Sequence, residues 1–201
     1  ADNDIALRIR NTGDTVTLLN QDDPSIVRLG TLERVTFANG TVWNEASLRQ
    51  LAVASQQTTG SDIVRGFHVA DTIEGGAGND MLRGAEGDDT YRFGAGFGQD
   101  TIEEIATVST QGGNDTIEFL AGIVPSSVTL SRPAGTDDLV LTVGSNSITI
   151  KNQFLLTPVF GMQNDVERVV FADGTVWTDE MIRSTLLTQA TTTGADVIRG
   201  F

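Results

Sequence analysis

The 201-residue sequence contains no cysteine, a single histidine, and no apolar run that approaches the roughly 20 residues of a membrane-spanning helix. We therefore expect no membrane span. Without cysteine no disulfide can hold the fold, so a chain that folds outside the cell needs a large core or another kind of staple. The histidine, His68, is expected in an exposed turn, and the sequence positions no serine beside it. We accordingly predict no catalytic residues and no enzyme.

Basic residues are scarce as well. The chain has 13 Lys and Arg against 27 Asp and Glu, which gives a formal net charge of -14. Proteins that bind nucleic acid gain affinity by neutralising phosphates, so this balance argues against a nucleic-acid partner. It favours solubility or a positively charged ligand. Residues 57–118 alone carry 12 acidic and 3 basic side chains, so most of the excess lies in one block.

The chain repeats itself at an offset of 134 residues. The stretch from Leu32 to Phe67 shares 17 of 36 positions with the stretch from Val166 to Phe201, without a gap. Such repeats indicate a modular array. We expect residues 1–56 to be the back part of one unit, 57–118 a glycine-rich block, 119–190 a capping segment, and 191–201 the start of the next block. The sequence does not begin with Met, so a fragment of a longer protein is expected.

The glycine-rich block has a shorter period of nine residues. Its aspartates recur at Asp62, Asp71, Asp80 and Asp89, and then at wider spacing at Asp100 and Asp115. Two positions after each aspartate stands an apolar or aromatic residue: Val64, Ile73, Leu82, Tyr91, Ile102 and Ile117. A flexible Gly/Asp-rich linker has no reason to keep hydrophobic residues at a fixed phase, so this spacing favours a folded repeat.

The nonapeptides fit the pattern G-G-x-G-x-D-x-U-x, where U is a large apolar residue. GGAGNDMLR (75–83) fits at every position, and GAEGDDTYR (84–92) fits except at the second glycine. This block resembles the repeats-in-toxin, or haemolysin-type calcium-binding, repeat family. SITIKNQF, VERVVFADGTVW and DEMIRSTL resemble the haemolysin-type calcium-binding-related segment that accompanies those repeats in large secreted bacterial proteins. The resemblance implies that each nonapeptide forms one turn and one strand, and that two of them make one coil of a parallel β-roll.

On this interpretation each turn stacks on the turn two repeats later, about 4.8 Å away. Asp62 then pairs with Asp80, and Asp71 with Asp89. Stacked carboxylates repel one another, and Ca²⁺, which takes about 6–8 oxygen ligands, removes the repulsion with the help of turn carbonyls. The predicted metal ligands are Asp62, Asp71, Asp80, Asp89, Asp100 and Asp115, with the turn residues Gly60, Gly75, Ala77, Gly78, Gly84, Glu86 and Gly87.

Two other pairs of adjacent acidic residues are candidate functional sites. Adjacent acids on a strand point to opposite faces, so we interpret Glu103-Glu104 as a solvated edge or an extra calcium ligand rather than a catalytic pair. The sequence around Asp137-Asp138 echoes the nonapeptide and suggests a weak additional calcium site. Arg65, Arg83, Arg92 and Arg199 are expected to face solvent and to pair with nearby acids.

The predicted fold class is all-β: a parallel β-roll of nonapeptide repeats with flanking strands and hairpins and short capping helices. Asn39-Gly40 and Asp173-Gly174 lie between alternating hydrophobic residues and predict two-residue hairpin loops. Asn44 and Thr178 are predicted to cap the short helices. The buried faces of these helices are expected to contain Leu48, Leu51, Met181, Ile182 and Leu186.

These observations favour a calcium-binding structural module of a large secreted bacterial repeat protein. By resemblance, such proteins leave the cell unfolded through a type I secretion system and fold outside on binding Ca²⁺. The expected partners are calcium ions, that secretion system and neighbouring repeat units of the same chain. Two alternatives remain: an accessory module of a secreted protease, lipase or polysaccharide epimerase, and an adhesin or carbohydrate-binding module. Trp43 and Trp177 could form a sugar platform, but strand alternation favours core packing.

Overall fold

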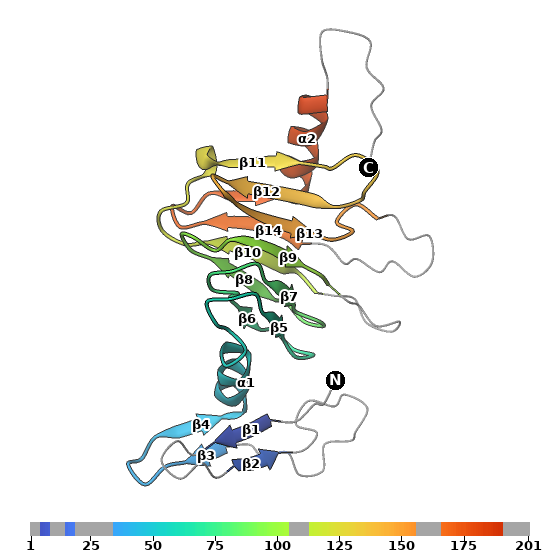
Figure 1. The fold of residues 1–201 in the computed structure, drawn as a ribbon. Coiled ribbons are helices and arrows are strands. Elements are labelled where there is room, and N and C mark those ends of the chain that lie inside the picture. The colour runs from blue at the N-terminus through green and yellow to red at the C-terminus, as the bar shows by residue number, and fades with distance from the viewer. Residues whose placement is uncertain (1–4, 9–14, 19–33, 105–112, 156–165, 191–201) are drawn as a thin grey trace. The chain divides into compact units, whose positions relative to one another are not determined.

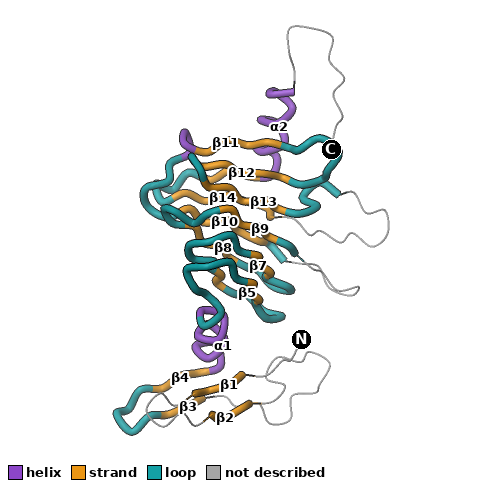
Figure 2. Tube along the Cα trace, viewed as in Figure 1, coloured by secondary structure: helices purple, strands orange, loops and turns teal. Residues whose placement is uncertain are grey.

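A computed structural model describes residues 5–8, 15–18, 34–104, 113–155 and 166–190 (Figures 1 and 2). The chain divides into two compact units, Ala1–Gln56 and Gln57–Phe201. The predictions for residues 191–201, including Asp196 and Arg199, fall outside the described residues. In the part that is described, no helix is long and apolar enough to cross a membrane.

The described residues of the first unit form two antiparallel strand pairs and a helix. β1 (Ile5–Arg8) pairs antiparallel with β2 (Thr15–Leu18), and β3 (Arg34–Thr36) pairs antiparallel with β4 (Val42–Asn44). Helix α1 (Glu45–Ala54) begins after Asn44, whose side chain accepts a 2.8 Å hydrogen bond from the Ser47 amide, as a predicted N-cap should.

The hairpin loops differ from the prediction of two residues. Phe37 donates its amide to the Thr41 carbonyl, so three residues close the first loop. Gly40 lies at a φ of +86°, and a third loop residue in this left-handed region is the usual feature of a three-residue hairpin. Phe171 and Thr175 make the same bond in the second copy, where Gly174 has a φ of +87°.

The described residues of the second unit form two sheets, and the strands from β5 to β10 alternate between them along the chain. The strands are β5 (Ile63–Arg65), β6 (Thr72–Ile73), β7 (Met81–Arg83), β8 (Thr90–Phe93), β9 (Gln99–Ile102), β10 (Asp115–Phe119), β11 (Val128–Ser131), β12 (Leu139–Val143), β13 (Asn146–Ile150), β14 (Val166–Phe171) and β15 (Val176–Thr178). One sheet has the order β11-β12-β13-β9-β7-β5, and the other has the order β15-β14-β10-β8-β6. Figure 1 shows these strands stacked in successive layers.

The hydrophobic residues of the nonapeptides form two columns between the sheets. Val64, Leu82, Ile102 and Ile150 lie in register in one sheet, and Ile73, Tyr91, Ile117 and Val169 in the other. The six that belong to the glycine-rich block are all completely buried. Because the last member of each column comes from the capping segment, that segment continues the core of the block.

The fold is rich in strands, as predicted, but its sheets are mixed. Parallel pairing joins β5, β7, β9 and β13 in one sheet, and β6, β8, β10 and β14 in the other. The pairs β11-β12, β12-β13 and β14-β15 are antiparallel. The antiparallel pairs arise where the chain reverses at once, for example at Gly144, which has a φ of +61°. A wholly parallel β-roll is therefore not what the structure shows.

Helix α2 (Asp179–Ala190) contacts β11, β14 and β15. Ile182 and Leu186 are buried as predicted, whereas Met181 is 49% exposed. In the first unit Leu48 is buried and Leu51 is 45% exposed. The prediction was wrong for Met181 because its side chain points about 100° away from that of Ile182 around the helix.

The two tryptophans are half-buried and lie edge-on against phenylalanines. Trp43 lies 4.6 Å from Phe37 between ring centroids, and Trp177 lies 4.8 Å from Phe171. Aromatic pairs prefer this edge-to-face geometry. The contacts fit the expected packing role better than an open sugar platform.

Candidate metal centre

The six predicted aspartates fall into two columns at the starts of the strands. Asp62, Asp80 and Asp100 lie at the starts of β5, β7 and β9, and Asp71, Asp89 and Asp115 lie at the starts of β6, β8 and β10. The parallel register of the strands places members of each column in adjacent layers. The two-repeat stacking expected for Asp62 with Asp80 and for Asp71 with Asp89 is present.

Each column is held together by a ladder of hydrogen bonds. The amide of one aspartate donates to the Oδ1 atom of the aspartate in the next layer. The four bonds are Asp62 to Asp80 at 2.9 Å, Asp80 to Asp100 at 2.9 Å, Asp71 to Asp89 at 2.8 Å and Asp89 to Asp115 at 2.9 Å. One oxygen of each accepting carboxylate is therefore used by the backbone.

The second oxygen is left without a partner in three of these carboxylates. The Oδ2 atoms of Asp80, Asp89 and Asp100 are buried and accept no hydrogen bond from the described residues. These side chains are only 3%, 0% and 2% exposed. A buried carboxylate oxygen without a donor or a cation is strongly unfavourable, so these atoms point to a missing positive ligand.

The electrostatics agree with this interpretation. Burial raises the pKa of Asp89 to about 9, against the hydrogen bond from Asp71, and the charges of Asp115, Glu104 and Asp71 add to the rise. Burial likewise raises the pKa of Asp100 to about 7 and also raises that of Asp80. The folded chain thus favours neutral carboxyl groups where the sequence supplies charged ones, and a bound cation would reverse that preference.

Glycines make room for the orphaned oxygens. A Cβ atom at Gly75 would collide with the Oδ2 atom of Asp80, and one at Gly84 would collide with that of Asp89. In both cases the glycine lies five residues before its aspartate. The nonapeptide therefore needs its first glycine because the carboxylate occupies the place of a side chain.

A second set of glycines brings the turns of successive layers close together. Gly78 has a φ of +140°, and a Cβ atom there would overlap the carbonyl group of Gly60. Gly98 stands in the same relation to the carbonyl of Gly78. The backbone of one turn therefore lies directly against the next turn, where main-chain carbonyl oxygens add to the oxygen atoms near the aspartates.

The remaining predicted turn residues line the same turns. Ala77 is exposed, and Gly87 has a φ of +117° and lies against the backbone of Val69. The Oε2 atom of Glu86 lies 3.6 Å from Nδ1 of His68. His68 is half-buried, which corrects its expected place in an exposed turn.

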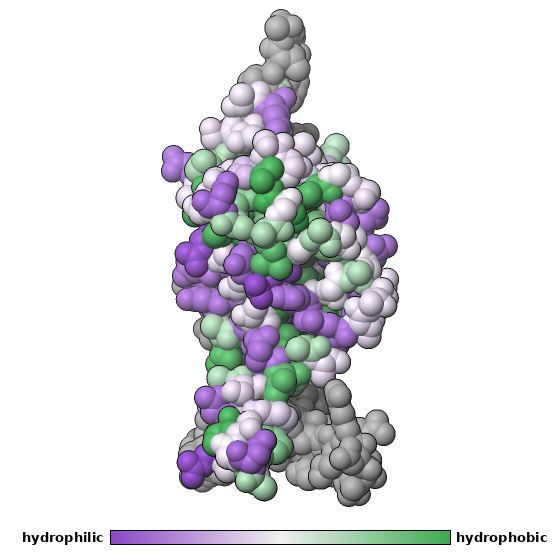
Figure 3. Space-filling view, turned by 90° about the vertical axis from the view of Figure 1, so that its left-hand side faces the viewer, coloured by the Kyte–Doolittle hydropathy of each residue, from purple (hydrophilic) through white to green (hydrophobic). Residues whose placement is uncertain are grey.

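The acids on the strands themselves are paired differently. Arg83 binds Glu103 at 2.5 Å, and Arg92 binds both Glu74 at 2.7 Å and Glu118 at 2.9 Å. These pairs are partly exposed, as expected for solvent-facing arginines. The face of the molecule in Figure 3 correspondingly mixes hydrophilic and hydrophobic residues.

The donor set fits a hard cation such as Ca²⁺. Within the described ranges, no three acidic or histidine side chains are grouped closely enough to hold a metal by themselves. Main-chain carbonyls would therefore have to complete the coordination, and Ca²⁺ accepts carbonyl and carboxylate oxygens together in flexible geometry. Asp80, Asp89 and Asp100 would supply the free carboxylate oxygens.

Two acidic residues join these columns although the nonapeptide pattern does not include them. Glu167 accepts the amide of Asp115 at 2.5 Å and so continues the second column into β14. Glu104 is 6% exposed, and the Tyr91 hydroxyl donates to its Oε1 atom. Burial raises the pKa of Glu104 to about 8, the charge of Asp115 adds to the rise, and the amides of Ala85 and Gly84 oppose it. The sequence signal for Glu104 is its position, because the equivalent residues of the two preceding layers, Gly66 and Gly84, are glycines.

The weak site suggested at Asp137-Asp138 has other partners. Asp137 binds Arg132 at 2.7 Å, and Asp138 binds Nζ of Lys151 at 2.6 Å. Asp138 also accepts the amide of Asn152 at 2.9 Å. Basic side chains already neutralise both carboxylates, so a calcium site is not needed there.

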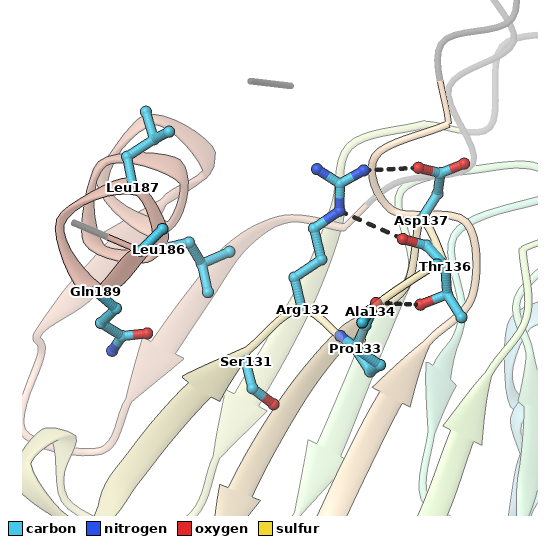
Figure 4. A pocket seen from close by; sticks show the side chains of 11 residues that line it. Ser131, Arg132, Pro133, Ala134, Thr136, Asp137, Leu186, Leu187 and Gln189 are labelled. Carbon is cyan, nitrogen blue, oxygen red and sulfur yellow. Dashed lines mark hydrogen bonds and ion pairs between the residues drawn. The ribbon is translucent and has the colours of Figure 1, made fainter. Parts of the chain in front are cut away.

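A cavity of about 810 Å³ lies between the β11-β12 loop and the end of α2 (Figure 4). Arg132 projects into this region, where it binds Asp137 and the Thr136 carbonyl. Leu186 and Leu187 line the helix side. The two ionisable side chains of the lining, Arg132 and Asp137, are thus bonded to each other.

Comparison with known families identifies the ion that repeats of this kind bind. The model of the RTX calcium-binding nonapeptide repeat, in four copies, matches residues 70–102, and the haemolysin-type calcium binding protein related domain matches residues 4–47 and 138–181. These matches support the RTX calcium-binding repeat family for this chain. The two matches to the related domain are 134 residues apart, as the internal repeat predicts. No match was found among curated proteins.

The two family matches confirm the resemblance seen in the nonapeptides and in the segments beside them. Haemolysin-type repeats bind Ca²⁺, so calcium is the ion of this protein. RTX repeats are typical of secreted bacterial proteins, and such domains are typically non-catalytic structural modules.

Proposed function

We propose that this chain is a calcium-dependent structural module of a larger secreted bacterial protein, and that its aspartate columns bind the calcium. The observation that carries the proposal is the set of buried, unpartnered Oδ2 atoms of Asp80, Asp89 and Asp100. With calcium bound, the parallel layers from β5 to β10 act as a β-roll, and the capping segment closes its end.

The calcium ligands in this proposal are the six column aspartates together with the carbonyl groups of the turns between residues 57 and 118. Without calcium the stacked carboxylates repel one another across a thin core, and the nonapeptide block loses its order. An ion that binds only the folded state stabilises it by about 2.7 kcal/mol at a hundredfold excess over its dissociation constant. Several such sites together decide whether the block folds.

This dependence suits a protein that crosses a type I secretion system unfolded. Calcium is scarce inside the cell and plentiful outside it, so the block would fold only after export. Neighbouring units of the same chain are the proposed structural partners, because the repeat at an offset of 134 residues places one unit directly after another. The module has no catalytic role in this proposal.

Circular dichroism and thermal melting in a chelator, in excess calcium and in excess magnesium test the proposal. We expect calcium to increase the β signal and the melting temperature. Magnesium should do much less, because it demands near-octahedral geometry at shorter distances and gives up water reluctantly. An unchanged signal and melting temperature in calcium would refute the proposal, and an equal response to magnesium would indicate charge screening instead.

A further inference from the structure

Glu104 occupies a position that belongs to glycine in the layers next to it. Arg65 pairs with Arg83, and Leu82 with Ile102, so the residues that follow these strands are also aligned. Gly66, Gly84 and Glu104 are therefore equivalent positions in three successive layers. In the first two layers the absence of a side chain makes room for an aspartate, whereas the third layer has a carboxylate of its own.

The Glu104 carboxylate reaches the turn at Gly84. The Tyr91 hydroxyl donates to Oε1 of Glu104, and the amides of Gly84 and Ala85 lie near this carboxylate, while Oε2 is buried and accepts no hydrogen bond of regular geometry from the described residues. The Oδ2 atom of Asp89 is buried and unpartnered in the same turn, and a Cβ atom at Gly84 would lie against both that atom and the Tyr91 hydroxyl. Two carboxylates, each more than nine-tenths buried, thus converge on one turn.

The arginines of the adjacent strands are bonded on the solvent side. Arg83 binds Glu103, the direct neighbour of Glu104, and Arg92 binds Glu74 and Glu118. The carboxylates of Asp89 and Glu104 repel each other when both are ionised. Because both are buried, water screens this repulsion only weakly. The site is therefore built for an added positive charge.

We propose that Glu104 is a calcium ligand that completes, together with Asp89 and turn carbonyls, the site at the Gly84 turn, although the nonapeptide pattern assigns no ligand at the position of Glu104. A glutamate carboxylate can bind Ca²⁺ through both oxygens, which suits a turn where glycine has been replaced. The chain also leaves the nine-residue repeat next to Glu104, because Asp115 follows Asp100 after fifteen residues instead of nine. This inference rests on the proposed calcium-dependent function.

Tyr91 acts as a positioning residue for this site. It stands at the apolar position of its nonapeptide, where the other repeats have Val, Ile or Leu, and its hydroxyl holds Glu104 by one oxygen. It is also the single tyrosine of the chain. Terbium replaces calcium at oxygen sites, so a terbium ion bound by Glu104 would lie near Tyr91. Excitation of Tyr91 would then sensitise the terbium luminescence.

The test counts the calcium ions bound per chain by isothermal titration calorimetry. It compares the unaltered protein with Glu104→Gln and with Glu103→Gln, a matched control in the adjacent, solvent-facing position. We expect Glu104→Gln to bind one ion fewer than the other two proteins. Tyrosine-sensitised terbium luminescence, defined as the part lost in Tyr91→Phe, should fall in Glu104→Gln and persist in Glu103→Gln.

The outcomes separate this inference from the proposed function. If the unaltered protein binds calcium and Glu104→Gln binds the same number of ions with the same affinity, Glu104 is not a ligand and the inference is wrong. If the unaltered protein binds no calcium, the proposed function fails first and this site with it. Should Glu104→Gln not fold in saturating calcium, Glu104→Gly, which restores the residue of the two neighbouring layers, replaces it. A full ion count in that variant would also overturn the inference.

Discussion

In the capping segment, aspartates lie beside basic side chains, whereas in the nonapeptide block they lie above one another. Asp138 is buried and binds Lys151, and Asp179 binds Arg183 within one turn of α2. Asp80 and Asp89 are more deeply buried, yet their neighbours along the column are further aspartates. Under the proposed function, aspartate therefore belongs to a self-sufficient fold in the capping segment and to a fold that depends on an external ion in the nonapeptide block.

Under the proposed function, the comparison assigns the dependence on calcium to the turns of the nonapeptide block. The block does not lack arginine, because Arg83 and Arg92 pair with outward glutamates on its strands. The turns, however, combine carboxylates with glycines that leave no space for a basic side chain beside them. Under the proposed function, calcium sensitivity follows from the turn sequence rather than from the overall acidity of the chain.

The largest expected effect comes from neutralising one column residue. Asp80→Asn keeps an acceptor for the Asp62 amide but removes the charge. In saturating calcium we expect it to lower the free energy of unfolding by about 3 kcal/mol, because a charged ligand is lost. In a chelator the same change should be neutral or stabilising, since a buried unpaired charge disappears.

The matched control is Asp138→Asn in the capping segment. It leaves Lys151 without its carboxylate, and because that lysine is partly exposed the loss should be about 1 kcal/mol. The loss should be the same with and without calcium. Denaturant unfolding of both variants in both conditions measures this. If Asp80→Asn lost equal stability in chelator and in calcium, the distinction between the two regions would disappear.

The pH dependence of stability should reverse when calcium is added. In a chelator, the fraction of molecules whose nonapeptide block is folded holds protons on Asp89, Glu104 and Asp100 with pKa values of about 9, about 8 and about 7, against ordinary values of 3.8 for aspartate and 4.5 for glutamate. Raised pKa values in acids mean that stability is full below about pH 4 and is lost as the pH rises through these values. With calcium, protons compete with the ion, so stability should rise with pH.

Melting temperatures between pH 5 and pH 9, in chelator and in calcium, measure this reversal. Asp80→Asn should retain the slope in chelator, because it leaves Asp89 and Glu104, with pKa values of about 9 and about 8, in place. Slopes of the same sign in both solutions would mean that calcium does not meet these carboxylates.

A smaller effect is expected at Ala85. This residue has a φ of +82° at the position where the preceding nonapeptide has Gly76, with a φ of +92°. A left-handed conformation is unfavourable for alanine, so Ala85→Gly should raise the free energy of unfolding by about 1 kcal/mol. Asn152→Gly is the control, because asparagine at its φ of 58° already tolerates this conformation and should gain less. Equal gains would argue against backbone strain as the cause.

The nonapeptide spacing was sufficient to predict the columns from Asp62 to Asp89 and their buried hydrophobic partners. A nine-residue period fixes both the turn and the phase of the strand, so sequence and structure carry the same information there. Asp100 and Asp115 come after longer steps, and their register depended on how the turns accommodate extra residues. The side chain of Glu104, which reaches back by one layer, lies beyond what a pattern of this kind specifies.

The capping segment was harder to predict for a different reason. Its strands β13 and β14 continue the parallel sheets, while β12 and β15 run antiparallel beside them. Alternating hydrophobic residues indicate strands but do not say which neighbour each will pair with. The exposure of Met181 likewise depends on how α2 is rotated against β11, which periodicity alone does not fix.

Amide hydrogen exchange tests the central claim most directly, because it reports the two regions separately in one experiment. Removing calcium should collapse the protection of amides in β5 to β9, such as those of Leu82 and Thr101, and should reduce that of the β12-β13 hairpin much less. Restoring calcium should return it, and restoring magnesium should not. Protection in β5 to β9 that is the same with and without calcium would contradict the account.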